Sequence, residues 1–124
     1  MRYTYSDAIL RLRPEAVFAI KDDEYDTLQW YDQVQTAPTE QEIQEKLAEI
    51  YAEEPYRLLR IERDLLFKEC DWVTLRAYRT GQPVPPEWAA YMQALADLPA
   101  NNTPTLTEFY ALDRSSVNWP VKPE

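Results

Sequence analysis

The sequence predicts a mostly helical α+β protein, and three patterns carry that prediction. Two short strand-like runs flank a polar turn near the start of the chain, which is typical of a β-hairpin. A long helical periodicity then follows a capping-box sequence. Seven of the ten prolines lie at or beyond residue 83, so the second half of the chain should consist of short segments.

A chain of 124 residues has room for one domain with one modest core. We expect one compact domain built from three segments. The N-terminal helix and the β-hairpin occupy residues 1–37, a helical region occupies residues 38–99, and an extended tail occupies residues 100–124.

The first expected element is a short helix over Asp7–Arg13. Ser6 or Thr4 can cap its N-terminus. Pro14 ends it, because the residue before a proline is biased away from the helical region.

The hairpin should follow directly. The runs 16–20 and 27–31 are rich in strand formers and flank the polar turn 21–26. A lone hairpin is marginal in water, so this one has to pack on the helices.

Thr39 and Glu42 have the three-residue offset of a capping box and open the long helix. Its apolar residues recur at helical spacing: Ile43, Leu47, Ile50, Tyr51, Leu58, Leu59, Ile61, Leu65, Leu66 and Val73. Pro55 should kink or interrupt this helix near Glu54, because proline removes a backbone donor and clashes with the preceding turn. We expect the helical pattern to continue to about Ala77.

A proline loop over 79–85 separates the long helix from the second helix of an αα-hairpin. Pro86 suits the first turn of that helix, and Pro99 ends it. The apolar side of the helix comprises Trp88, Tyr91, Met92, Leu95 and Leu98.

Aromatic contacts should close this αα-hairpin. Trp72 is expected to pack against Trp88 or Tyr91 across the loop. Asp71 is expected to cap or pin the turn where the long helix ends.

The chain carries 13 Lys and Arg against 22 Asp and Glu, a net charge of -9. This charge argues against binding to nucleic acid or to an anionic membrane, which needs a basic surface. The sequence has no histidine, one cysteine and one glycine, which removes histidine-based nucleophilic catalysis, Cys/His zinc sites and glycine-rich phosphate loops. We therefore predict a protein that is not an enzyme and that needs no cofactor or metal.

Two smaller features have ordinary explanations. Asp22, Asp23, Glu24 and Asp26 cluster in the hairpin turn, but they lack the glycine and the spacing of a calcium loop, so we interpret them as a solvated turn. The single Cys70 cannot form an intrachain disulfide and is expected to be a small buried apolar residue.

No signal peptide or membrane span is evident, and the cytosol is the default location.

Nine Tyr, four Trp and three Phe make up 13% of the chain, which is high for a small core. Tyr and Trp are enriched at interface hot spots, so we predict a protein-binding module. The candidate partner-binding residues are Trp72, Trp88, Tyr91, Arg76, Arg79 and Trp119. For Trp72, Trp88 and Tyr91 the alternative is that they form only the core of the hairpin.

The tail should dock on the body or on a partner. Its scattered anchors are Leu106, Phe109, Tyr110, Leu112, Val117 and Trp119. Trp119 is the best candidate for an exposed anchor, because a tryptophan in an extended proline-rich tail is expected to bind in a pocket.

The stretch Leu58–Pro99 resembles the phage tail assembly chaperone-like family. The matching features are the arginine-rich lead-in 60–66, the Cys70-Asp71-Trp72 triplet, the proline loop, and the segments 88–95 and 97–99. The end of the chain, 116–120, is similar to tail-fibre-linked members.

The resemblance implies a non-enzymatic phage protein that binds tail-fibre, baseplate or other tail subunits, as an assembly chaperone or as an adaptor retained in the virion. It would then be found in the virion tail, in the host cytoplasm during assembly, or in both. Self-association is left open. The alternative from a different class is an acidic inhibitor or DNA mimic that acts on a host nucleic-acid-binding protein, with Glu40, Glu42, Glu45, Glu49, Glu53 and Glu54 as its acidic side.

Overall fold

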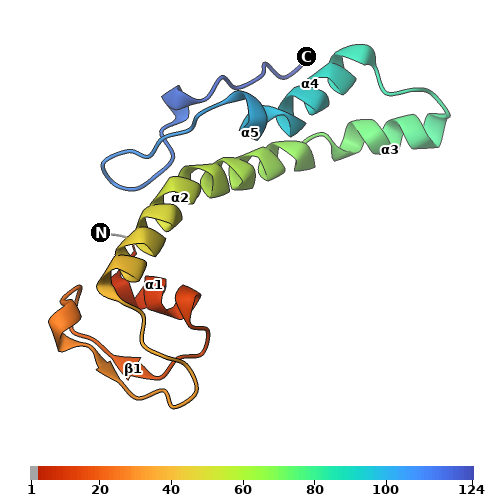
Figure 1. The fold of residues 1–124 in the computed structure, drawn as a ribbon. Helices are drawn as coiled ribbons and strands as arrows, with labels where there is room; N and C mark the ends of the chain where they lie inside the picture. Colours follow the sequence, from red (N-terminus) through yellow and green to blue (C-terminus); the bar gives the residue numbers. More distant parts are fainter. Residues whose placement is uncertain (1–2) are drawn as a thin grey trace. The chain divides into compact units, whose positions relative to one another are not determined.

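The computed structural model describes residues 3–124 and confirms a mostly helical α+β protein. The chain divides into two compact units, Met1–Glu54 and Pro55–Glu124, and each has its own core (Figure 1). We call them the N-terminal unit and the C-terminal unit. The long helix α2, Glu40–Lys68, contributes its first half to one and its second half to the other.

The N-terminal unit begins with α1, Tyr5–Leu12, which confirms the short helix. Thr4 is the N-cap residue, and its backbone N–H donates a hydrogen bond to Asp7 Oδ2 at 2.7 Å. Asp23, from the acidic turn, accepts a bond from the backbone N–H of Tyr5 at 2.9 Å. One carboxylate of that turn therefore holds the start of α1.

The hairpin is confirmed in the middle of the two expected runs. Strand β1, Phe18–Ala19, pairs antiparallel with β2, Gln29–Trp30, and the connection contains the 3-10 helix η1, Tyr25–Thr27. The Phe18 and Trp30 rings stack with their centroids 6.1 Å apart. As expected, the hairpin packs on helices, with a core formed by Tyr5, Ala8, Ile9, Ile43, Leu47 and Ile50.

The capping box of α2 is confirmed. The Thr39 hydroxyl accepts a bond from the Glu42 backbone N–H at 3.1 Å, and the Glu42 carboxylate accepts one from the Thr39 N–H at 3.2 Å. Pro55 lies inside α2, which is bent but not interrupted. The expected end near Ala77 is wrong, because the helix stops at Lys68. There the Cys70 N–H donates to the Phe67 carbonyl three residues back, which tightens the last turn.

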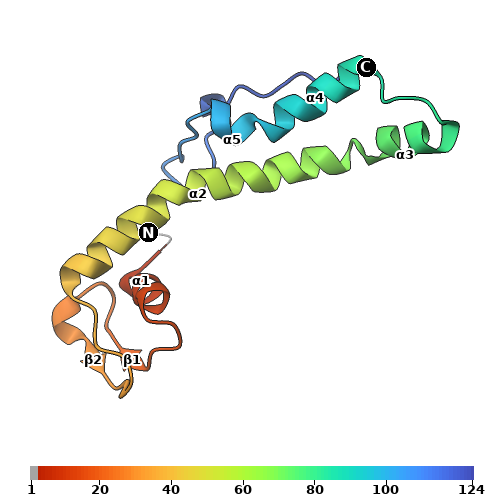
Figure 2. The same cartoon turned by 45° about the vertical axis from the view of Figure 1, so that its right-hand side comes forward.

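The C-terminal unit continues with α3, Asp71–Thr80, and α4, Pro86–Ala96. Gly81 has a φ of 70°, the left-handed conformation that ends α3, and α4 then runs back alongside α2 (Figure 2). Pro99 does not end α4, as the sequence suggested. The helix ends at Ala96, and Pro99 lies in the first turn of the short helix α5, Leu98–Asn101, where a missing backbone donor costs nothing.

The tail docks on the C-terminal unit itself. After the end of α5, the described residues 102–124 have as regular pieces only the single bridge between Leu106 and Leu112 and the 3-10 helix η2, Arg114–Ser116. Val117 is buried with Leu59, Cys70, Val73, Trp88, Tyr91, Leu95 and Leu98, and Leu112 and Trp119 pack against this cluster. Phe109, expected to be an anchor, is 79% exposed. Within residues 3–124, no helix is long and apolar enough to cross a membrane.

Candidate partner-binding surface

The corner between α3 and α4 brings the predicted tryptophans together. The ring centroids of Trp72 and Trp88 are 5.4 Å apart with 80° between the planes, and those of Trp88 and Tyr91 are 6.0 Å apart at 86°. These edge-to-face contacts are favourable for aromatic quadrupoles. The expected closure of the αα-hairpin by aromatic contacts is confirmed.

Burial separates the roles of the three aromatic residues. Trp88 and Tyr91 are each 6% exposed, and burial raises the pKa of the Tyr91 phenol above its ordinary value. Trp72 keeps 51% of its surface exposed while it contacts Trp88. Trp88 and Tyr91 are thus core residues of the hairpin, and Trp72 is available to a partner.

A hollow of about 410 Å³ lies beside this corner. The residues that define its chemistry are Trp72, Arg76, Thr80, Pro83, Pro85 and Trp88. Two indoles and two prolines give its wall somewhat more apolar than polar surface, and Arg76 and Glu124 add one positive and one negative charge. Such a hollow can receive one or two apolar side chains of a partner, with a carboxylate near Arg76.

The other three predicted residues lie outside the hollow. Arg79 is exposed farther along α3, and Tyr91 is in the core. Trp119 is half-buried: its indole N–H donates to the Arg114 carbonyl at 3.2 Å, and the Arg114 guanidinium lies 4.5 Å from the ring centroid. The structure therefore uses Trp119 to hold the tail on its own unit.

The turn between α2 and α3 differs in detail from the expectation. Cys70 is buried, its thiol lies 3.5 Å from the Leu66 carbonyl oxygen, and burial raises the thiol pKa. The N-cap residue of α3 is Cys70, and no side-chain capping bond is made there. Asp71, expected to cap the turn, instead places a negative charge in the first turn of α3, where it suits the helix dipole.

Sequence reasoning missed Leu75 and Tyr78 on α3. They are 58% and 86% exposed, and Val73 is the one buried residue of the helix. A single helix through Ala77 implies one buried stripe, which gives outward-facing apolar residues no role. The signal that could identify Leu75 and Tyr78 is that they are apolar and lie outside the buried stripe.

The described residues 3–124 contain no group of three or more His, Cys, Asp or Glu side chains that could hold a metal ion. Apolar and cationic side chains instead gather on α3, beside a hollow. This surface is typical of helical protein-interaction modules.

Residues 56–124 match the model of the phage tail assembly chaperone protein family, and the chain belongs to this family. The resemblance seen in the sequence is thereby confirmed, and membership gives the protein a role in phage tail assembly. The match covers the C-terminal unit except Pro55 and leaves the N-terminal unit outside. No curated protein and no solved structure matches the chain.

Proposed function

We propose that this protein binds a tail-fibre or other tail subunit during assembly, without catalysing a reaction, as a chaperone or as an adaptor that stays in the virion. The observation that carries the proposal is Trp72, half exposed beside the hollow that it lines with Arg76. An aromatic anchor next to a cation, in a chain of this family, is suited to hold a protein partner.

The two units suit different parts of this task. The exposed apolar residues of α3 can cover an apolar surface on an unassembled subunit. The N-terminal unit has thirteen acidic and five basic residues, a net charge of -8. This charge would keep the complex soluble until assembly.

Quantitative mass spectrometry of purified particles beside the infected lysate tests the proposal. A fixed ratio to a tail protein in particles supports an adaptor. Abundance in the lysate bound to a tail protein, with absence from particles, supports a chaperone. Absence from particles together with no tail partner in the lysate overturns the proposal.

A pair of variants then tests the surface. Trp72→Ala should weaken capture of the tail partner, because it removes the exposed anchor. Phe109→Ala is the matched control, since Phe109 is 79% exposed in the same unit and lies away from the hollow. Equal capture by both variants would show that binding uses another surface.

The second candidate, an acidic inhibitor of a nucleic-acid-binding protein, is supported by one observation. The acidic excess lies in the N-terminal unit, outside the family match. This candidate predicts salt-sensitive binding to a basic DNA-binding protein and none to tail subunits. Neither candidate requires nucleic acid or a membrane as partner.

A further inference from the structure

A row of exposed side chains follows α2 into α3 with alternating spacings of four and three residues. Its members are Ile61, Leu65, Lys68, Trp72, Leu75 and Arg79, and we call it the 61–79 stripe. All six are exposed, and the four apolar members keep 46%, 57%, 51% and 58% of their surfaces open. This spacing is that of a helix face that packs lengthwise against another helix.

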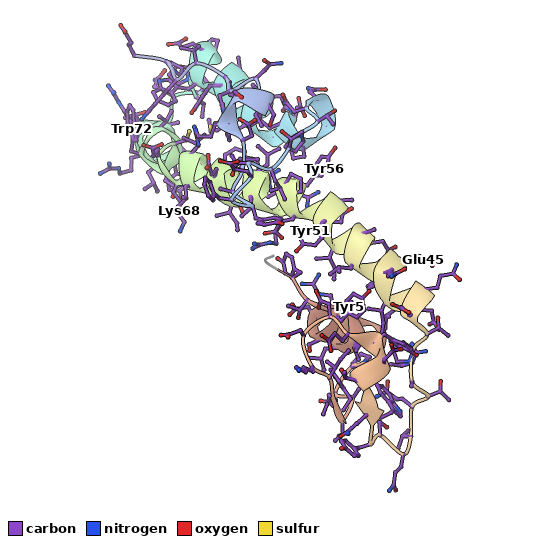
Figure 3. The ribbon with its side chains drawn as sticks, turned by 90° about the vertical axis from the view of Figure 1, so that its left-hand side faces the viewer. Tyr5, Glu45, Tyr51, Tyr56, Lys68 and Trp72 are labelled. Carbon is purple, nitrogen blue, oxygen red and sulfur yellow. The ribbon has the colours of Figure 1, made fainter. Side chains whose placement is uncertain are left out.

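The break between the helices does not disrupt the stripe. Cys70 keeps right-handed helical backbone angles, and α3 continues along the line of α2 (Figures 1 and 2). Lys68 and Trp72 lie on either side of this junction (Figure 3). At about 1.5 Å per residue, the stripe is roughly 27 Å long, which matches about five helical turns of a partner.

The side chains of the stripe are not part of the core of the C-terminal unit. The inward face of the same helices is already filled, since Leu59, Cys70 and Val73 are buried in the C-terminal unit. The helices therefore have two apolar faces, and the chain covers one of them. An exposed row of apolar side chains, interrupted here by Lys68 alone, is typical of a binding surface.

The charges around the stripe indicate the kind of partner. Across residues 60–80, all of which the structure describes, three of the four acids have ion-pair partners. Glu62 pairs with Arg114, Asp64 with Arg63, and Glu69 with Lys122. Asp71 alone is unpaired, whereas four cations in the same span have no ion-pair partner: Arg60, Lys68, Arg76 and Arg79.

We propose that the 61–79 stripe binds an amphipathic α-helix whose apolar face is flanked by acidic residues. This inference rests on the proposed function, because the helix would belong to the tail subunit. Unpaired cations along an apolar row favour carboxylates beside the partner's apolar face. A second copy of this chain in parallel pairing fits less well, since it would bring Lys68 and Arg79 against the same cations. An antiparallel copy would instead set Arg79 against Ile61 and Lys68 against Trp72, and it remains an outcome of the test below.

Three synthetic 21-residue peptides test the inference with the full chain. The first has leucines in alternating three- and four-residue spacing with glutamates beside them, the second has lysines in place of the glutamates, and the third scrambles the first. We expect fluorescence anisotropy to show the glutamate peptide binding at least about tenfold more tightly than the other two. Raising the salt concentration should weaken its binding.

Substitutions then locate the binding. Leu65→Glu and Leu75→Glu should each reduce affinity for the glutamate peptide at least about tenfold, because they place a charge in the apolar row. Val34→Glu is the matched control, since Val34 is 93% exposed in the N-terminal unit and gains the same charge. Circular dichroism of all three should equal that of the unchanged chain.

Several results would overturn the inference: equal affinity for the three peptides, tighter binding of the lysine peptide, or unchanged binding by both leucine variants. A dimer of the free chain that Leu75→Glu dissociates would assign the stripe to a second copy instead. A tail partner retained by both leucine variants would overturn this inference and leave the proposed function intact. Specific binding of the glutamate peptide, with no tail partner in the lysate, would support this inference and overturn the proposed function.

Discussion

The indole of Trp72 meets the indole of Trp88 edge to face, with ring centroids 5.4 Å apart and 80° between the ring planes. One ring is half exposed on α3, and the other belongs to a buried residue of α4. The pair therefore joins the core of the C-terminal unit to its candidate binding surface. Substitution of Trp88 should mainly lower the stability of the unit, and substitution of Trp72 should mainly weaken binding of a partner.

Trp88→Ala should lower the free energy of unfolding by about 3–5 kcal/mol, because it empties a buried site. Trp72→Ala should cost less than Trp88→Ala, because half of the Trp72 surface is already exposed, and the ring contact that it loses is worth about 0.5–1.5 kcal/mol beyond area burial. Urea unfolding followed by circular dichroism measures both. Similar losses for the two variants would contradict the division of roles.

Thr39→Ala should lower the free energy of unfolding by about 1 kcal/mol, since the Thr39 hydroxyl caps the start of α2. Thr36→Ala is the control, because Thr36 is exposed and lies before the helix. Chemical denaturation of both variants checks this. A loss as large in Thr36→Ala would show that the capping bond is not the cause.

The elements that the sequence predicted well depend on local chemistry. The Thr39 and Glu42 capping box, the hairpin around the acidic turn and the Trp72–Trp88 contact all follow from residues near one another along the chain. Short-range hydrogen bonds decide the capping box. The hairpin and the Trp72–Trp88 contact also depend on the core that packs against them, and the short connections bring the two partners of each within reach.

The predictions from the sequence fail where tertiary packing decides where a helix ends or which of its faces is buried. The apolar periodicity of α2 continues past Lys68, but the helix ends there, where the Cys70 N–H donates to the Phe67 carbonyl three residues back. The 61–79 stripe was missed because the pattern alone cannot say which of two apolar helix faces its own chain covers.

Stability of the N-terminal unit should fall in acid. Hydrogen bonds from the Gln35 and Val34 N–H groups lower the pKa of Asp32 below its ordinary 3.8, and the Thr39 N–H lowers that of Glu42 below 4.5. The folded-state pKa values lie below the unfolded ones, so their contribution is complete above the unfolded values and is lost as pH falls through the folded ones. Unfolding measured from pH 7 downward should show the loss beginning near about 4.5.

The variant Asp32→Asn/Glu42→Gln removes both titrating groups and keeps acceptor oxygens. Its unfolding free energy should depend less on pH in the acidic range than that of the unchanged chain. Asp26→Asn is the control, because the Asp26 carboxylate accepts no hydrogen bond within residues 3–124. An acid dependence unchanged in the double variant would place the titrating groups elsewhere.

Trp119→Ala should lower the free energy of unfolding of the C-terminal unit by about 1–3 kcal/mol, because the ring packs on the core cluster and under Arg114. Val121→Ala is the control, since Val121 is 90% exposed in the same tail. Limited proteolysis should cut the tail sooner in Trp119→Ala. Equal cleavage of the two variants would show that Trp119 does not hold the tail.

The C-terminal unit should fold without the N-terminal one. Its buried cluster draws every member from Leu59 to Val117, so a fragment spanning 55–124 keeps the whole cluster, and the family match begins at residue 56. We expect this fragment to show a helical circular dichroism spectrum and a cooperative thermal transition. If the proposed function is right, it should also capture the tail partner, with reduced solubility because the unit with net charge -8 is gone. A fragment that folds but captures nothing would instead place part of the binding surface in the first 54 residues.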